Sequence, residues 1–110
     1  MTQEDKELLL KDICARLPYK VKVCLYKKET CILIGIDGDE VYLDVDSDSF
    51  YMENIKPYLR PIHKLTKEEL EELEFLTDSD YVDYCNKHHI DYRNLIPKGL
   101  ALEAPEGMYK

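Results

Sequence analysis

The sequence predicts an α+β fold. We expect a small antiparallel β-barrel of four to five strands, SH3-like in type, with one helix before it and two short helices and an irregular packed tail after it. Three observations favour this fold. Apolar residues recur at helical spacing before residue 18 and again within 66–88, they alternate at strand spacing in 21–60, and Pro and Gly interrupt the apolar tail after residue 90.

The chain of 110 residues has the usual size of a single domain, 1–110. We expect an N-terminal helix in 1–18, the small barrel in 19–62, and a helical and irregular part in 63–110. The length leaves no room for a two-domain enzyme with a cleft between its domains.

The N-terminal helix is expected over residues 3–16. Thr2 can cap it, with Asp5 three residues further on, and acidic residues occupy the first turn, where the helix dipole favours them. Pro18 ends the helix. Four apolar residues recur near helical spacing and form one apolar stripe: Leu9, Leu10, Ile13 and Leu17.

The middle of the chain predicts short strands joined by hairpins. Apolar and β-branched residues form the runs 21–25, 31–34, 41–45, 50–55 and 56–61. Turn signals separate these runs at 27–29, 37–39 and 46–48. Such a short sheet protects its edges best by curling into a barrel, which is why we expect one.

The C-terminal part returns to helical spacing. Thr66 and Glu69 form a capping box before one helix, and a second helix is expected over about 80–88, capped by Ser79 or Asp78. The tail from residue 90 is too apolar to be free and too rich in Pro and Gly for a long helix, so we expect it to pack across the core as short turns. The expected buried residues of the two helices are Leu70, Leu73, Phe75, Leu76, Tyr81, Tyr84 and Cys85.

The composition excludes several classes of protein. Lys plus Arg number 15 against 23 Asp plus Glu, a formal charge of −8, which is the reverse of the balance in most nucleic-acid binders. No apolar run approaches the ~20 residues that span a bilayer, and no signal peptide is recognisable. Four cysteines are too few for a disulfide scaffold, so we expect a cytoplasmic protein that needs no cofactor.

Alternating carboxylates at Asp44, Asp46 and Asp48 invite a calcium interpretation, because such oxygens can converge on a hard cation. The EF-hand pattern, however, requires Gly and Glu where this chain has Ser49 and Ile55. We therefore interpret the run as a polar turn whose side chains bond the backbone.

Cys85, His88 and His89 form a Cys-x-x-His-His cluster of a kind that zinc accepts. A structural zinc site needs four ligands, and no second ligand pair is present; Cys24, Cys31 or His63 would have to join it. The alternative is a buried cysteine beside two histidines at a helix end. No catalytic motif is present, and nothing places a thiol beside a base, so we expect no enzyme.

Nine tyrosines and no tryptophan are more informative, because tyrosine combines apolar area with a hydrogen-bonding tip and is enriched in interfaces. Four of them fall on or beside the predicted strands and make a candidate surface for docking a partner protein: Tyr19, Tyr26, Tyr42 and Tyr58. The alternative is that most tyrosines cover the small core.

Three blocks of sequence carry a family resemblance: 55–61 (IKPYLRP), 88–96 (HHIDYRNLI) and 99–109 (GLALEAPEGMY). Together they resemble a group of small proteins encoded in gut bacterial genomes and in their phages and prophages. The resemblance covers nearly the whole chain. It implies a compact cytoplasmic protein of mobile-element origin, and it assigns neither an activity nor a binding residue.

The function predicted from the sequence is a non-enzymatic module that docks a protein partner through its tyrosine-bearing strands. One alternative is an acidic inhibitor or nucleic-acid mimic that binds a basic host protein through runs such as 68–72, although such a run also suits a solvated helix face. The other is a small barrel that binds single-stranded nucleic acid. The residues that favour this last alternative are Tyr19, Lys20, Lys22, Tyr26, Lys27 and Lys28.

Overall fold

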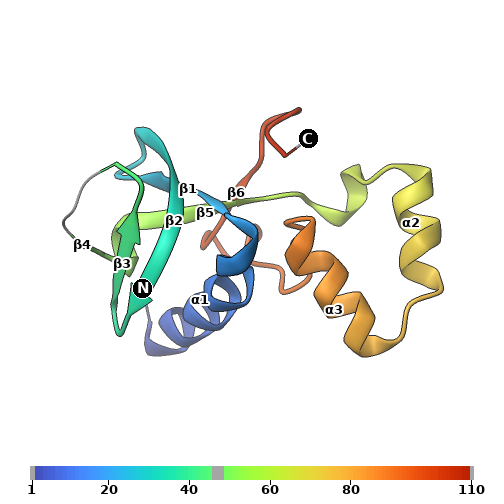
Figure 1. The fold of residues 1–110 in the computed structure, drawn as a ribbon, viewed down its shortest axis with the longest axis horizontal. Helices are drawn as coiled ribbons and strands as arrows, with labels where there is room; N and C mark the ends of the chain where they lie inside the picture. Colours follow the sequence, from blue (N-terminus) through green and yellow to red (C-terminus); the bar gives the residue numbers. More distant parts are fainter. Residues whose placement is uncertain (1, 46–48, 110) are drawn as a thin grey trace.

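The computed structural model describes residues 2–45 and 49–109, in which six strands form one sheet beside three α-helices (Figure 1). Three short 3-10 turns lie between these elements, at Leu17–Tyr19, Met52–Asn54 and Ile62–Lys64. The elements in chain order are α1 (Gln3–Arg16), β1 (Lys22–Leu25), β2 (Glu29–Asp37), β3 (Glu40–Leu43), β4 (Ser49–Tyr51), β5 (Ile55–Leu59), α2 (Lys67–Glu74), α3 (Asp78–Lys87) and β6 (Leu102–Glu103).

The sheet has the strand order β4-β3-β2-β1-β5-β6, and every pair is antiparallel except β5–β6. The predicted α+β class is therefore confirmed. The predicted closed barrel is wrong, because the sheet is open. The physical reason is that β6, which comes from the C-terminal tail, occupies the side of β5 where β4 would have to pair, and β4 is only three residues long.

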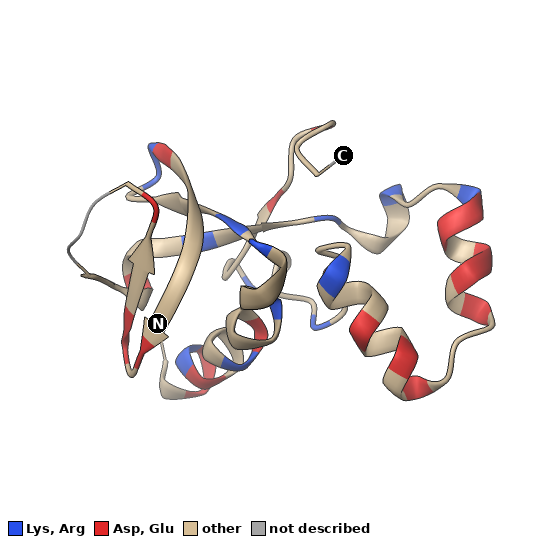
Figure 2. Ribbon diagram, viewed as in Figure 1, with Lys and Arg blue, Asp and Glu red and all other residues tan. Residues whose placement is uncertain are grey.

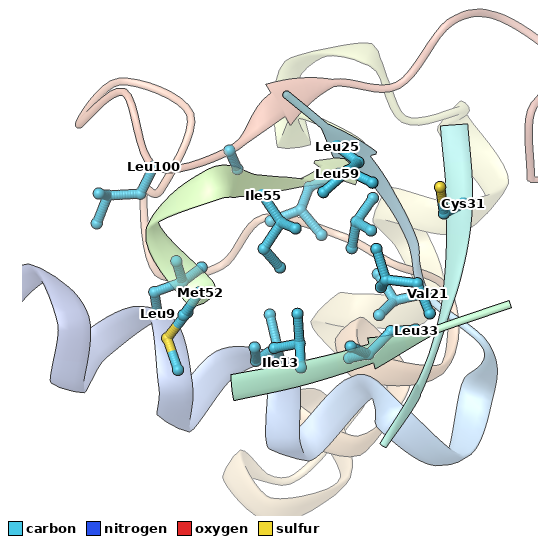
Figure 3. Close-up of a cluster of buried hydrophobic side chains, with 14 of the residues drawn as sticks. Leu9, Ile13, Val21, Leu25, Cys31, Leu33, Met52, Ile55, Leu59 and Leu100 are labelled. Atoms are coloured by element: carbon cyan, nitrogen blue, oxygen red, sulfur yellow. The ribbon is translucent and has the colours of Figure 1, made fainter. Parts of the chain in front are cut away.

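Helix α1 packs on one face of the sheet and begins where the sequence predicts. Thr2 and Asp5 form the capping box, in which the Asp5 N–H donates to Thr2 Oγ1 at 3.1 Å. Apolar side chains of α1 and the strands meet between the two layers (Figure 3). The buried residues of this main core include Leu9, Ile13, Val21, Val23, Leu25, Leu33, Val41, Leu43, Ile55, Leu59, Leu95 and Leu100.

The strand alternation is confirmed in its main features but ends early in β3. Val45 was expected to continue the buried series, yet it is 48% exposed and lies beyond the end of the strand. Ile34 follows the buried Leu33 and points outwards, and the register shift between Leu33 and Gly35 then brings Ile36 back to the core side. Asp44 lies in the turn after β3, where its Oδ1 accepts a hydrogen bond from the Ile32 N–H at 2.8 Å. The calcium candidates Asp46 and Asp48 lie outside the described residues.

The C-terminal part makes a second, smaller core. The Thr66–Glu69 capping box is present, but α3 is capped by Thr77 rather than by Ser79 or Asp78. The tail packs into the main core, as expected, and supplies β6. The smaller core contains Leu65, Leu73, Cys85 and Ile90, with Leu76, Tyr81, Tyr84 and Tyr92 packed against it.

Candidate docking groove on the sheet

The structure brings together two of the four candidate tyrosines. Tyr26 and Tyr58 line one groove of about 550 Å³. Tyr19 lies in the turn after α1 and is 40% exposed, and Tyr42 on β3 packs beside Gly35 of β2. The remaining lining residues of the groove are Cys24, Lys27, Glu53, Asn54, Lys56 and Leu102.

The groove lies on the face of the sheet opposite α1. Side chains alternate between the two faces of a strand, and Val23 and Leu25 of β1 point into the main core. Cys24 therefore points to the other face, as does Lys56, which pairs with it across β1 and β5. No α-helix of the described chain supplies a lining residue to the groove, so its floor is the outer surface of the sheet, and the 3-10 turn before β5 adds Glu53 and Asn54.

The turn that presents Tyr26 has an unusual backbone. Tyr26 and Lys27 both adopt left-handed conformations, with φ of 52° and 62°. Such conformations cost non-glycine residues about 1–3 kcal/mol each and are maintained only where neighbouring contacts fix them. Here the Tyr26 N–H donates to the Asn54 carbonyl at 3.0 Å, and the Lys28 N–H donates to the Leu25 carbonyl at 3.0 Å. The turn thus holds the Tyr26 ring, 54% exposed, at the rim of the groove.

Tyr58 is the half-buried partner across the groove. A hydrogen bond with the Cys24 side chain raises the pKa of the Tyr58 hydroxyl, and burial adds to the effect, although Thr30 acts in the opposite direction. The phenol therefore stays protonated at neutral pH. The protonated phenol adds a hydrogen-bonding group beside the apolar Leu102 and the Tyr26 ring, and such mixed linings are usual in recognition pockets.

The charge around the groove differs from that of the whole chain. Lys27 and Lys56 flank the two tyrosines, against the single carboxylate of Glu53. Figure 2 shows basic residues on β1 and β5, whereas acidic residues dominate α2 and α3. The groove therefore combines aromatic walls with a basic rim, on a protein whose net charge is −8.

One side of β5 remains open beside the groove. Strand β6 pairs only with Tyr58 and Leu59, so within the described chain Ile55 and Lys56 have a strand neighbour on the β1 side alone. An extended segment of another chain that entered the groove would lie next to this unpaired edge.

Tyr109, in the C-terminal tail, joins the ends of β1 and β5, the two strands that carry the groove. Sequence analysis did not single it out. The Tyr109 hydroxyl accepts a hydrogen bond from the Lys22 N–H at 2.9 Å and donates to the Tyr58 carbonyl at 2.8 Å. It thereby bridges β1 and β5 where their ladder ends, next to Val23 and Pro57. Its ring stacks on His89 at a centroid distance of 4.0 Å. No local sequence signal marks this role, because it depends on where the tail packs.

The structure does not assemble the zinc candidates. Cys85 is fully buried in the smaller core, His63 is exposed on a separate turn, and the His89 ring faces Tyr109. Among residues 2–45 and 49–109, no three His, Cys, Asp or Glu side chains lie close enough together to hold a metal ion. Burial also lowers the pKa of His88, which disfavours its charged form.

His89 gives the protein a predicted sensitivity to acid. Burial, followed by the nearby charge of Arg16, lowers its pKa to about 4, from 6.5. Between these two pH values His89 is protonated in the unfolded chain but neutral in the folded protein. The free energy of unfolding therefore falls as the pH is lowered from about 6.5 to about 4. Urea denaturation across this range should show a weaker pH dependence in His89→Phe than in the wild type. Replacing the exposed His63 by Asn is the control, and an equal change in that variant would contradict the prediction.

A buried ionic cluster fixes the C-terminal part to α1. Asp12 and Arg16 are both fully buried, with 2.8 Å between Asp12 Oδ2 and Arg16 Nε. Arg16 also donates to the carbonyls of Cys85 and Ile90, and Arg93 Nε lies 3.2 Å from Asp12 Oδ1. The cluster therefore joins α1, α3 and the tail. The Asp12 carboxylate and the Arg16 guanidinium both bond within the fold, which indicates a structural role.

Asp91, within the block 88–96, also has a structural role. Asp91 is buried, and its carboxylate accepts hydrogen bonds from the N–H groups of Leu95 and Ile96 at 2.9 and 3.0 Å. These bonds fold the chain so that Leu95 enters the main core. The polar turn around Asp91 thus positions the tail.

Comparisons place no outside constraint on the groove. No helix of the described residues is long and apolar enough to cross a membrane. The chain matches no protein-family model, no curated protein and no solved structure.

Proposed function

We propose that the protein is a non-enzymatic interaction module that binds an extended segment of a partner protein in the Tyr26–Tyr58 groove. The observation that carries this proposal is the groove itself, with a volume of about 550 Å³ and an aromatic wall on an uncovered sheet face. Rigid aromatic side chains at the centre of a concave surface are the usual anchors of protein interfaces.

The chemistry of the groove selects the segment. Tyr26, Tyr58 and Leu102 offer apolar area, while Lys27 and Lys56 attract carboxylates at the rim. The preferred occupant is an extended peptide with one large apolar residue and a neighbouring Asp or Glu. Main-chain pairing with the open edge of β5 contributes further affinity.

The strand arrangement supports an SH3-like interpretation of this module. The strand order β4-β3-β2-β1-β5, in which the fifth strand returns to the first, is consistent with an SH3-like sheet whose closure is incomplete. The sheet also curls enough for the Phe50 ring of β4 to meet the Tyr26 ring, with 6.2 Å between ring centroids. Small curled sheets of this kind serve many binding functions, so the groove rather than the fold specifies the ligand.

The test is a pull-down with tagged protein from a lysate of the cells that carry the gene, with and without nuclease. We expect a stoichiometric protein partner that resists nuclease. Tyr26→Ala should weaken its binding about tenfold or more, since truncating an interface anchor removes more than about 1.4 kcal/mol. Tyr19→Ala is the matched control, because Tyr19 is also exposed but lies outside the groove.

Two outcomes would contradict the proposal. The first is equal loss of the partner in both tyrosine variants, which would deny the groove a special role. The second is capture of nucleic acid alone, removed by nuclease, which would instead favour binding of single strands across Tyr26 and the lysines of the β1–β2 turn.

A further inference from the structure

Phe75 is an anomaly of the C-terminal part. It lies at the end of α2, and 86% of its side chain is exposed, the largest fraction among the exposed large apolar residues of the described chain. Burying a phenylalanine side chain stabilises a fold, and this fold leaves the Phe75 ring in water. The next residue, Leu76, packs against the smaller core instead. The expectation that Phe75 belongs to the buried stripe of α2 is therefore wrong.

The same face of α2 is acidic. Glu68, Glu71 and Glu72 precede Phe75 by seven, four and three residues, which places all four side chains on one side of the helix. All three carboxylates are exposed, whereas Leu73 on the opposite side is buried. Glu69, another acid of α2, is paired with Arg60.

The acidic face is continuous with the start of α3. Residues 66–80 contain a single basic residue, Lys67. Figure 2 shows the resulting run of acidic residues along α2 and into α3. The acidic residues of 66–80 are Glu68, Glu69, Glu71, Glu72, Glu74, Asp78 and Asp80.

We propose that this face of α2, ending in Phe75, docks a basic amphipathic helix of another protein. Charge complementarity selects a basic occupant and rejects nucleic-acid phosphates. Eight helical residues present a surface about 12 Å long, which matches two turns of a partner helix. Lys and Arg on that helix pair with the glutamates, while its aliphatic side chains or a cationic head group cover the Phe75 ring.

This surface is independent of the Tyr26–Tyr58 groove. The groove has a basic rim and lies on β1 and β5, whereas the Phe75 face is acidic and lies on α2. The two sites attract partners of opposite charge, so the failure of one proposal leaves the other standing.

The experiment is a titration of the ¹⁵N-labelled protein with a synthetic Leu/Lys amphipathic peptide of about 14 residues, followed by NMR. We expect the shift changes to concentrate in 66–80, with Phe75 among the largest. Phe75→Ser should weaken binding about tenfold. Glu71→Gln/Glu72→Gln should weaken it more than Glu4→Gln/Glu7→Gln, which removes the same charge from α1.

Phe75→Ser should leave the melting temperature of the protein unchanged, because the exposed ring makes no core contact. That measurement separates loss of binding from loss of the fold. Shift changes spread equally over α1 and α2, or an unaltered affinity in Phe75→Ser, would show general charge attraction and overturn the proposal. Absence of binding to the peptide would overturn it as well.

Discussion

Asp12→Ala should lower the free energy of unfolding by about 3–5 kcal/mol, the loss typical when one partner of a buried ion pair is removed. The substitution leaves the Arg16 guanidinium fully buried without its carboxylate, and Arg93 loses the anion 3.2 Å from its Nε. Domains are stable by only about 5–15 kcal/mol, so this variant should be close to unfolding at 37 °C. Urea denaturation followed by circular dichroism measures the change.

The control for Asp12→Ala is Lys6→Ala. Lys6 faces Glu53 across 3.9 Å at the surface, where both side chains are at least one third exposed. Such exposed pairs contribute about 0–1 kcal/mol. If Asp12→Ala were as mild as Lys6→Ala, the ionic cluster would not be what holds the C-terminal part to α1.

Tyr109→Ala should cost about 2–4 kcal/mol, because it removes a packed ring together with two hydrogen bonds. The ring stacks on His89, and the hydroxyl bridges Lys22 of β1 and Tyr58 of β5. Tyr109→Phe isolates the hydroxyl: it leaves the Lys22 N–H and the Tyr58 carbonyl without this partner, at a cost of about 1–3 kcal/mol.

Thermal and urea unfolding of both Tyr109 variants would measure these losses, and amide exchange would locate them. We expect faster exchange in the β1 and β5 segments near Lys22 and Tyr58. Tyr51→Ala is the matched control, because Tyr51 is 60% exposed. Equal effects of Tyr51→Ala and Tyr109→Ala would contradict the bridging role of the tail.

The local elements could be predicted from the sequence because their causes are local. Thr2 with Asp5, and Thr66 with Glu69, are capping boxes whose partners lie three residues apart, and both helices begin there. Gly38 in the turn between β2 and β3 has a φ of 63°, which glycine adopts without strain. The cap of α3 was missed because Thr77, Asp78 and Ser79 are all acceptable caps, and only the structure distinguishes them.

The features that could not be predicted all depend on contacts between distant residues. An open sheet follows from the pairing of the two-residue β6 with β5, across some forty residues of chain. Asp12 and Arg16 have the i, i+4 spacing of an ordinary surface pair, and only the packing of α3 and the tail buries them. Likewise, strand alternation predicts that Tyr42 points away from the core. It does not predict that Tyr26 and Tyr58 share a groove, because that depends on how β1 and β5 pair.

The most direct test of the Tyr26–Tyr58 groove as a docking site is selection of a random peptide library against the protein, followed by calorimetry with the best peptide. We expect enriched peptides that combine a large apolar residue with Asp or Glu. Their affinity should fall about tenfold or more in Tyr26→Ala and in Lys56→Glu, yet stay unchanged in Tyr19→Ala. Failure to enrich any peptide, or an affinity unchanged by both groove substitutions, would show that the groove is not a docking site.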